Sequence, residues 1–318
     1  MGKADTVTKN YMKQNNVFAD AFNMYLYNGR QIIRPEQLRE MDTAALSIPY
    51  GTGQAGAPVQ KYRDVFRGVS AMEDGTAAYL LLGIENQTEI HYAAPVRNLL
   101  YDALQYAGQA ETAAKRHRDA KDYGGHTRGE FLSGFYREDR LLPVITLVLL
   151  FSPEEWNGPR TLREMMAVKD DSILSLLPDY RLHLLAPSEL SEEKLEKSET
   201  SLGNVLSFIK YSEDSAQLKN WMDKKGADVF LGRQEIDVLN ACINVGLKAD
   251  EKEEGVKMCE AIRQMTEEAE VKGRAEGREE SKLTDIRSLM ETLRLTAEQA
   301  MAALKIPERE QAGFLDKL

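Results

Sequence analysis

The stretch from residue 62 to residue 86 constrains the fold most, because it predicts a β-hairpin with a defined register. Asp74-Gly75 stands between two strand-like runs, and Asp-Gly is a strong hairpin signal because both turn positions need positive φ. With these two residues as the turn, residue 73 pairs with residue 76, and counting outward pairs Asp64 with Glu85. Side chains on paired strand positions lie about 5 Å apart at Cβ. The sequence therefore predicts two facing carboxylates.

The predicted pair of Asp64 and Glu85 favours a cation between the two side chains. Like charges this close repel one another, so the pairing is costly unless a positive ion lies between them. Hard divalent ions such as Mg²⁺ bind oxygen ligands of this kind. Gln87 falls on the same face as Glu85, two residues further along the strand. The predicted strands are long, and a β-bulge between residues 64 and 73 would shift the register by one residue.

Composition describes a soluble globular protein. The chain has 318 residues, of which 42% are hydrophobic and 29% are charged, and this leaves room for one large domain or two ordinary ones. No apolar run approaches the roughly 20 residues of a membrane span, and the first residues lack the apolar core of a signal peptide. Cys242 and Cys259 fall in helix-like stretches and predict free thiols. We therefore expect a cytoplasmic protein with no membrane contact.

The net charge of −10 argues against a generic nucleic-acid coat, but it does not exclude a nuclease with local contacts. One basic stretch stands out, and it comprises Lys115, Arg116, His117, Arg118, Lys121 and Arg128, with Arg137 and Arg140 further on. Asp119, Asp122 and Glu130 interrupt it, which favours a solvated face over a phosphate-binding track.

Hydrophobic periodicity and turn residues predict the order of helices and strands in the first part of the chain. The expected elements are a helix at 10–28, a strand at 44–49, the hairpin at 62–73 and 76–86, a helix at 94–118, a strand at 144–151, a short helix at 162–168 and a strand at 180–186. This αβββαβ order predicts an α/β fold with a mixed sheet, in which the long helix is a crossover between strands. The buried stripe expected on that helix consists of Val96, Leu99, Leu100, Ala103, Leu104 and Ala107. The glycine-rich loop 51–58 lacks Gly-Lys-Ser/Thr, which argues against a phosphate-binding loop.

From residue 189 onward the pattern becomes helical and increasingly acidic. We expect a first domain at 1–188, an all-helical region at 189–280 and a small C-terminal helical segment at 281–318. Glycines within the charge-dense segment 273–280 weaken the helix expected at 251–280, and the segment is interpreted as an exposed helix or a linker.

Several segments, in this order and spacing, resemble the Rpn family of recombination-promoting nucleases, also described as putative YhgA-like transposases. The segments that carry the resemblance are 18–23, 62–65, 82–88, 95–97 with Tyr101, 142–148, 156–159 and 179–182. Together they span roughly residues 10–187. That family belongs to the PD-(D/E)XK superfamily, so the resemblance implies a restriction-endonuclease-like αβββαβ core.

The resemblance implies a metal-dependent endonuclease that acts on DNA in recombination or mobile-element activity. Asp64 and Glu85 would hold a divalent ion, most simply Mg²⁺, with Ca²⁺ and Mn²⁺ as alternatives. Gln87 stands where many relatives of the wider fold have Lys; it can orient a water but supplies no charge. Asp20, Arg97 and Tyr101 are the candidate supporting residues, and Arg97 could hold a neighbouring phosphate.

Structural alternatives stay open for each of these residues. Asp64 fits an ordinary solvent-facing strand residue, and Glu85 fits a salt bridge to Arg63 or Arg97. Asp20 fits a plain helix residue, and Arg97 and Tyr101 fit helix-surface packing. The alternative function is a catalytically inactive, nuclease-like DNA-binding or regulatory module. Such a module would form a homo-oligomer through its helical C-terminal half.

Overall fold

The computed structural model describes residues 2–41, 44–47, 59–62, 64–73, 76–122, 124–226, 229–250, 254–315 and 317–318. Its main sheet has five strands in the order β1-β4-β5-β6-β7. These strands are β1 (Arg39–Glu40), β4 (Val65–Glu73), β5 (Thr76–Gln87), β6 (Val144–Leu150) and β7 (His183–Leu185). The pairs β1–β4 and β4–β5 are antiparallel, whereas β5–β6 and β6–β7 are parallel. The predicted α/β class with a mixed sheet is confirmed.

The hairpin of β4 and β5 has the register that the sequence predicts. Glu73 pairs with Thr76, and the pairing continues without a bulge to Val65 and Ile84. The turn residues 74 and 75 lie outside the described part of the chain. Continuing the register by one position places residue 64 opposite residue 85.

The strand predicted at 44–49 was placed in the wrong sheet. β2 (Ala44–Ser47) pairs with β3 (Val59–Tyr62) in a separate two-stranded sheet, while the two-residue strand β1 forms the edge of the main sheet. Pairing two segments this close in the chain has a low entropic cost of loop closure, and this favours a local hairpin over a place in the main sheet. The loop predicted at 51–58 lies outside the described residues.

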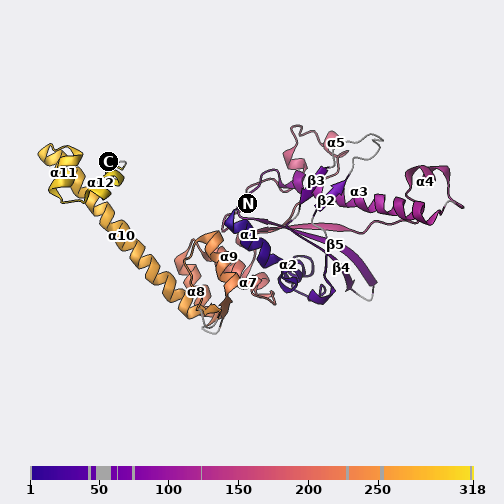
Figure 1. The fold of residues 1–318 in the computed structure, drawn as a ribbon, viewed down its shortest axis with the longest axis horizontal. Coiled ribbons are helices and arrows are strands. Elements are labelled where there is room, and N and C mark those ends of the chain that lie inside the picture. Colours follow the sequence, from indigo (N-terminus) through magenta and orange to yellow (C-terminus); the bar gives the residue numbers. More distant parts are fainter. Residues whose placement is uncertain are drawn as a thin grey trace.

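Helices connect and cover the sheet. The helix predicted at 10–28 is in fact two helices, α1 (Lys3–Met12) and α2 (Asn15–Tyr27), and Asn28 ends α2 in the left-handed conformation. α3 (Ala94–Ala120) is the predicted crossover from β5 to the parallel β6. The short helices are η1 (Pro35–Gln37), α4 (Arg128–Ser133), η2 (Arg163–Met165), α5 (Asp171–Leu174), η3 (Pro187–Glu189) and α6 (Glu192–Glu196). Figure 1 shows α4 at the tip of α3.

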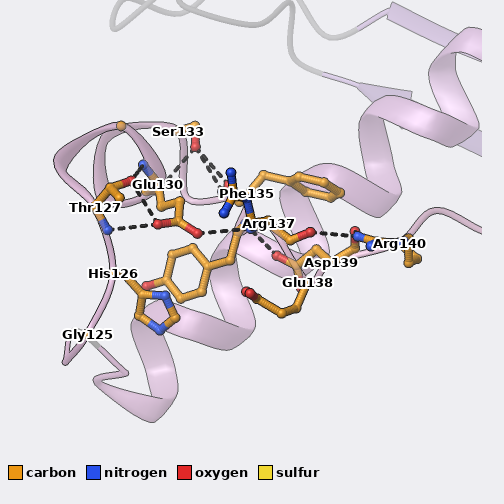
Figure 2. A pocket seen from close by; sticks show the side chains of 12 residues that line it. Gly125, His126, Thr127, Glu130, Ser133, Phe135, Arg137, Glu138, Asp139 and Arg140 are labelled. Atoms are coloured by element: carbon orange, nitrogen blue, oxygen red, sulfur yellow. Dashed lines mark hydrogen bonds between the residues drawn. The ribbon is translucent and has the colours of Figure 1, made fainter.

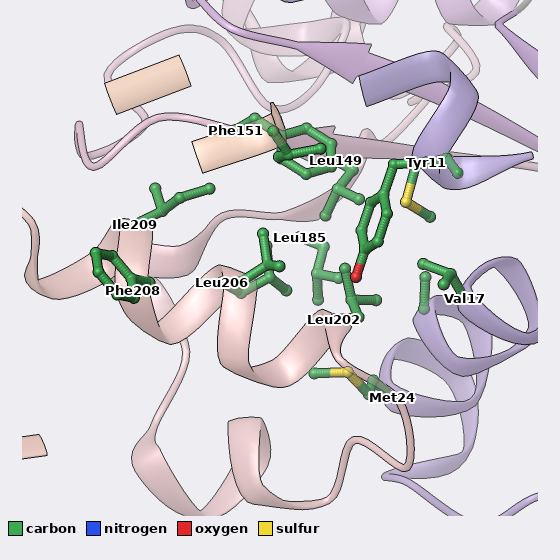
Figure 3. Close-up of a cluster of buried hydrophobic side chains, with 14 of the residues drawn as sticks. Tyr11, Val17, Met24, Leu149, Phe151, Leu185, Leu202, Leu206, Phe208 and Ile209 are labelled. Atoms are coloured by element: carbon green, nitrogen blue, oxygen red, sulfur yellow. The ribbon is translucent and has the colours of Figure 1, made fainter. Parts of the chain in front are cut away.

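The two faces of the sheet are covered by different helices, because alternate strand residues point to opposite sides. Leu147 and Leu149 belong to a large buried cluster with Phe18 of α2 and Leu206 of α7 (Leu202–Tyr211) (Figure 3). The intervening residues of β6 pack against Ala94 at the start of α3. Side chains of β5 that pair with these intervening residues therefore face α3.

The hydrophobic core crosses the domain boundary predicted at 188. The cluster that holds α1, α2 and β6 also contains residues of α7, α8 (Ser215–Lys225) and α9 (Arg233–Ile243). The region predicted as all-helical also contains two short paired strands, β8 (Phe230–Gly232) and β9 (Gly255–Lys257). Large apolar faces on α7 and α9 complete the core of the sheet domain instead of forming one of their own.

The C-terminal segment packs around a small core of its own. α10 (Met258–Leu293) runs unbroken through residue 280, and α11 (Ala297–Ala303) and α12 (Glu308–Leu315) lie at its far end (Figure 1). Ile286, Met301 and Phe314 are buried together there. Within the described ranges, no helix is both long and apolar enough to cross a membrane.

Candidate functional site

Asp64 and Glu85 lie together at the end of the β4–β5 hairpin that is remote from its turn. Glu85 is 4% exposed, and it faces α3 because its partner across the parallel pairing is Val148. Asp64 stands one residue before β4, opposite Glu85 in the continued register. The backbone N–H of Asn86 donates a hydrogen bond of 2.9 Å to Asp64 Oδ2. This bond fixes the first carboxylate against the strand that carries the second.

One cation approaches each of the two carboxylates. Lys9 Nζ lies 4.0 Å from Asp64 Oδ1, and Arg97 Nη2 lies 3.9 Å from Glu85 Oε2. The salt bridge from Glu85 to Arg97 that the sequence left open is therefore present, whereas residue 63 lies outside the described chain. Burial raises the pKa of Asp64, although the Asn86 hydrogen bond and the charges of Lys9 and Arg97 act in the opposite direction. The fold thus holds a partly buried carboxylate whose ionised form it disfavours.

Buried polar atoms without hydrogen bonds surround this pair. Within the described residues, they include both side-chain polar atoms of Asn86 and of Asn98, Nε and Nη2 of Arg97, and the indole N–H of Trp156. Asn86 lies next to Glu85 on β5, Arg97 and Asn98 lie on the first turns of α3, and Trp156 packs with the start of α3 in one buried cluster. Buried polar groups are rarely left without hydrogen bonds in folded proteins, so their concentration here makes this part of the fold a candidate site.

Gln87 lies two residues after Glu85 on β5, and Tyr101 lies on α3. Gln87 is half-buried, and its Nε2 donates a hydrogen bond of 2.9 Å to the carbonyl oxygen of Asn86. Its Oε1 is the atom that it can offer to a water. Tyr101 is buried one helical turn after Arg97 on α3. The free orientation of Oε1 is compatible with the predicted water-positioning role of Gln87.

Asp20 is engaged elsewhere in the fold. Its carboxylate accepts hydrogen bonds from Ser198 Oγ, from the backbone N–H of Glu199, and from both N–H and Oγ1 of Thr200. These bonds order the turn before α7 and pin it to α2. The supporting catalytic role considered for Asp20 does not fit this environment, because a structural turn already occupies both of its oxygens.

The buried face of α3 differs from the apolar stripe that periodicity predicts. Val96 is 46% exposed, whereas Asn98, Tyr101 and Asp102 are buried. Asp102 accepts hydrogen bonds from Thr146 Oγ1 of β6 at 2.6 Å and from the Tyr180 hydroxyl at 2.7 Å. The predicted apolar stripe was wrong, because hydrogen bonds from Thr146 and Tyr180 allow polar residues of α3 to be buried against the sheet.

The donor set of the pair fits a hard divalent cation. Asp64 and Glu85 offer carboxylate oxygens, the ligands that Mg²⁺ prefers, and Gln87 adds an amide oxygen on the same strand face as Glu85. Burial raises the pKa of Asp64 because it makes the charged carboxylate unfavourable. A bound cation would offset this cost. Lys9 and Arg97 provide part of that charge in the structure itself.

A second group of metal-ligand side chains lies at the tip of α3. Ligand atoms of His126, Glu130 and Glu138 lie within 4.8 Å of one another, beside a cavity of about 790 Å³ lined by residues of α4 and its flanking loops (Figure 2). Glu130 closes the capping box of α4: its carboxylate accepts hydrogen bonds from Thr127 and from the backbone N–H of Arg137. These bonds lower the pKa of Glu130 to about 2.

The basic stretch predicted from the sequence meets acidic partners in this lobe. Arg116 and His117 both contact Asp139, at 2.6 Å and 2.9 Å. The rings of His117 and His126 each stack on Tyr136, with centroids 3.7 Å and 3.9 Å away. Ion pairs and ring stacking thus engage Arg116, His117 and His126 within the lobe.

Four residues of the site went unrecognised in the sequence: Lys9, Asn86, Asn98 and Trp156. Asn98 and Tyr101, with Ala94, have helical spacing and could have indicated the polar buried face. Lys9 gave no signal, because only the packing of α1 brings it to Asp64.

Two carboxylates, two cations and several buried amide groups thus meet at one end of the sheet. Comparison of the chain with protein-family models, with curated proteins and with solved structures finds no match in any of the three.

Proposed function

We propose that the chain is a divalent-metal-dependent endonuclease that hydrolyses phosphodiester bonds of DNA. The observation that carries the proposal is the hairpin register, which runs without a bulge to Val65 and Ile84, the residues next to Asp64 and the buried Glu85. Ligand sites of open α/β sheets lie beyond the carboxyl ends of the parallel strands, and Glu85 and Gln87 end β5 at that edge. The sequence resemblance to recombination-promoting nucleases agrees with this position.

The buried groups without hydrogen bonds support a site for a polar ligand. Arg97 Nε and Nη2 lie beside Glu85 and can donate two hydrogen bonds to phosphate oxygens. A ligand that accepts these bonds recovers the free energy that the apo fold loses by burying the groups. A phosphodiester provides both the charge and the acceptors that Arg97 requires.

The proposed reaction adds water across the phosphodiester bond. The oxygen of a water forms a bond to phosphorus, the bond from phosphorus to the leaving sugar oxygen breaks, and that oxygen takes up the proton that the water releases. Gln87 Oε1 would orient the water, and Arg97 would hold an oxygen of the phosphate. Asp64 and Glu85 would hold a divalent ion, which when bound supplies positive charge and a more acidic water.

A plasmid assay tests the proposal. The intact protein is incubated with supercoiled DNA and Mg²⁺, and wild type is compared with Asp64→Asn and Glu85→Gln. We expect nicked or linear DNA from wild type alone, and none in the presence of a chelator. Equal cleavage by all three proteins would rule out the assigned residues, and a folded wild type without cleavage would rule out the activity.

The second candidate function is a nuclease-like DNA-binding or regulatory module without activity. The ion pairs from Lys9 to Asp64 and from Arg97 to Glu85 favour it, because they neutralise both acids without a metal. Oligomerisation through α10, α11 and α12 belongs to this candidate. Shifted DNA in a gel without cleavage would support it, and light scattering with and without residues 250–318 tests the oligomer.

A further inference from the structure

Lys9 places a positive charge at the candidate site from a helix that is remote in sequence. Its ammonium lies 4.0 Å from Asp64 Oδ1, and its side chain is 23% exposed, so it borders the site and reaches solvent. Lys9 stands one helical turn after Asp5 on α1, and the charge of Asp5 also acts on Asp64. The first helix of the chain thus forms one wall of the site.

The position of Lys9 is fixed by contacts on the opposite side of α1. The fully buried Tyr11 bonds through its hydroxyl to Ser201 Oγ at 3.0 Å, and Ser201 donates to Glu235 of α9 at 2.5 Å. Gln14, just after α1, donates to Gln234 at 2.6 Å. Contacts with Ser201 and with α9 therefore orient α1 so that the side of the helix that carries Lys9 lies toward the site.

The site requires a cation with the properties of Lys9. Gln87 carries no charge, and the guanidinium of Arg97 already faces the buried Glu85. Negative charge grows on the phosphoryl oxygens during hydrolysis, and preorganised cations that stabilise this charge contribute strongly to catalysis. A lysine ammonium is a compact charge with three donors on a flexible stem, so it can follow the phosphate as bonds change.

We propose that Lys9 is a catalytic residue of this nuclease, whose ammonium stabilises the phosphate oxygens while water replaces the leaving sugar oxygen. The inference rests on the proposed function. The ammonium donates hydrogen bonds and keeps its proton, so the bonds formed and broken are those given above. Asp64 holds Lys9 at the site before the substrate arrives.

The test compares Lys9→Met with wild type in two measurements on the intact protein. DNA cleavage with Mg²⁺ should fall by about 100-fold, the usual effect of removing one donor to a transition state. Mn²⁺ affinity, measured by calorimetry without DNA, should increase severalfold, because a cation that competes for Asp64 has been removed. A purely structural Lys9 would lower both quantities.

Three further variants complete the experiment. Lys3→Met on the exposed side of α1 should match wild type in both measurements. Lys9→Arg should keep most cleavage, and Gln87→Lys should restore part of it to Lys9→Met. Wild-type cleavage by Lys9→Met, or weaker Mn²⁺ binding together with lost cleavage, would overturn the role of Lys9 alone. A folded wild type that does not cleave DNA would overturn the proposed function, and the role of Lys9 with it.

Discussion

The end of the β4–β5 hairpin and the α4 lobe both gather acidic side chains, but they treat them in opposite ways. At the hairpin, burial raises the pKa of Asp64, and nearby amide and guanidinium groups lack hydrogen bonds. In the lobe, three hydrogen bonds hold the pKa of Glu130 down to about 2. In the lobe, hydrogen bonds within the fold stabilise the Glu130 carboxylate. At the hairpin end, buried polar groups lack such bonds, and a ligand could supply them. Unfavourable polar burial, and not the number of metal-ligand side chains, is therefore the reason for proposing the hairpin end as the functional site.

The largest expected difference between the two regions concerns cleavage. Glu85→Gln should reduce Mg²⁺-dependent DNA cleavage by at least about 1,000-fold, because a bound metal supplies several kcal/mol to the transition state. Glu130→Gln should leave the rate unchanged, and the two rates are compared on the same supercoiled substrate. A large loss in Glu130→Gln with a normal rate in Glu85→Gln would move the active site to the lobe.

The cations of the two regions should differ next. Arg97→Met removes the ion pair between Arg97 and the buried Glu85 and should lower the free energy of unfolding by about 3 kcal/mol. Arg116→Met breaks the pair with Asp139 at a side chain that is 66% exposed, and this change should be about 0.5 kcal/mol. Urea denaturation measures both values. Equal losses would show that the Glu85–Arg97 pair behaves as an ordinary surface contact.

Added metal should stabilise the protein through the hairpin site alone. At a Mg²⁺ concentration about 100 times its Kd, the free energy of unfolding should rise by about 2.7 kcal/mol. Thermal denaturation with and without a chelator measures this effect. Glu85→Gln should lose it and Glu138→Gln should keep it, whereas the reverse pattern would assign the metal to His126, Glu130 and Glu138.

The sequence predicts one half of the hairpin site and misses the other, for a physical reason. The separation of Asp64 and Glu85 follows from local turn geometry, because each residue pair of a regular hairpin determines the next. Lys9 and Asn98 reach the site through the docking of α1 and α3, which depends on contacts with α9 and with Thr146. Periodicity cannot show such contacts.

The same distinction explains the errors in the overall fold. The boundary at 188 was inferred from a change in composition, but apolar faces of α7 and α9 complete the core under β6. A strand was predicted at 44–49, but its partner is β3 in a separate sheet and not a strand of the main sheet. Local signals therefore predicted the elements and the β4–β5 register, while the tertiary partners of those elements came only from the structure.

The smallest expected difference is in the pH dependence of stability. The folded state raises the pKa of Asp64, so it binds protons more tightly than the unfolded chain does. The contribution of Asp64 to the free energy of unfolding therefore falls as pH rises from its usual pKa of 3.8 through the folded value. For Glu130 the folded pKa of about 2 lies below the usual 4.5, so its contribution is full above 4.5 and is lost as pH falls toward 2.

Replacing each carboxylate by a neutral amide should change the free energy of unfolding in opposite directions at Asp64 and at Glu130. Without metal at neutral pH, Asp64→Asn should raise the free energy of unfolding by about 0.5–1 kcal/mol, because the amide oxygen still accepts the Asn86 hydrogen bond without burying a charge. Glu130→Gln should lower it, and the loss should disappear in acid. Urea denaturation across a pH series measures both changes. If Asp64→Asn were destabilised at every pH, the carboxylate would serve the fold, and the contrast with the lobe would not hold.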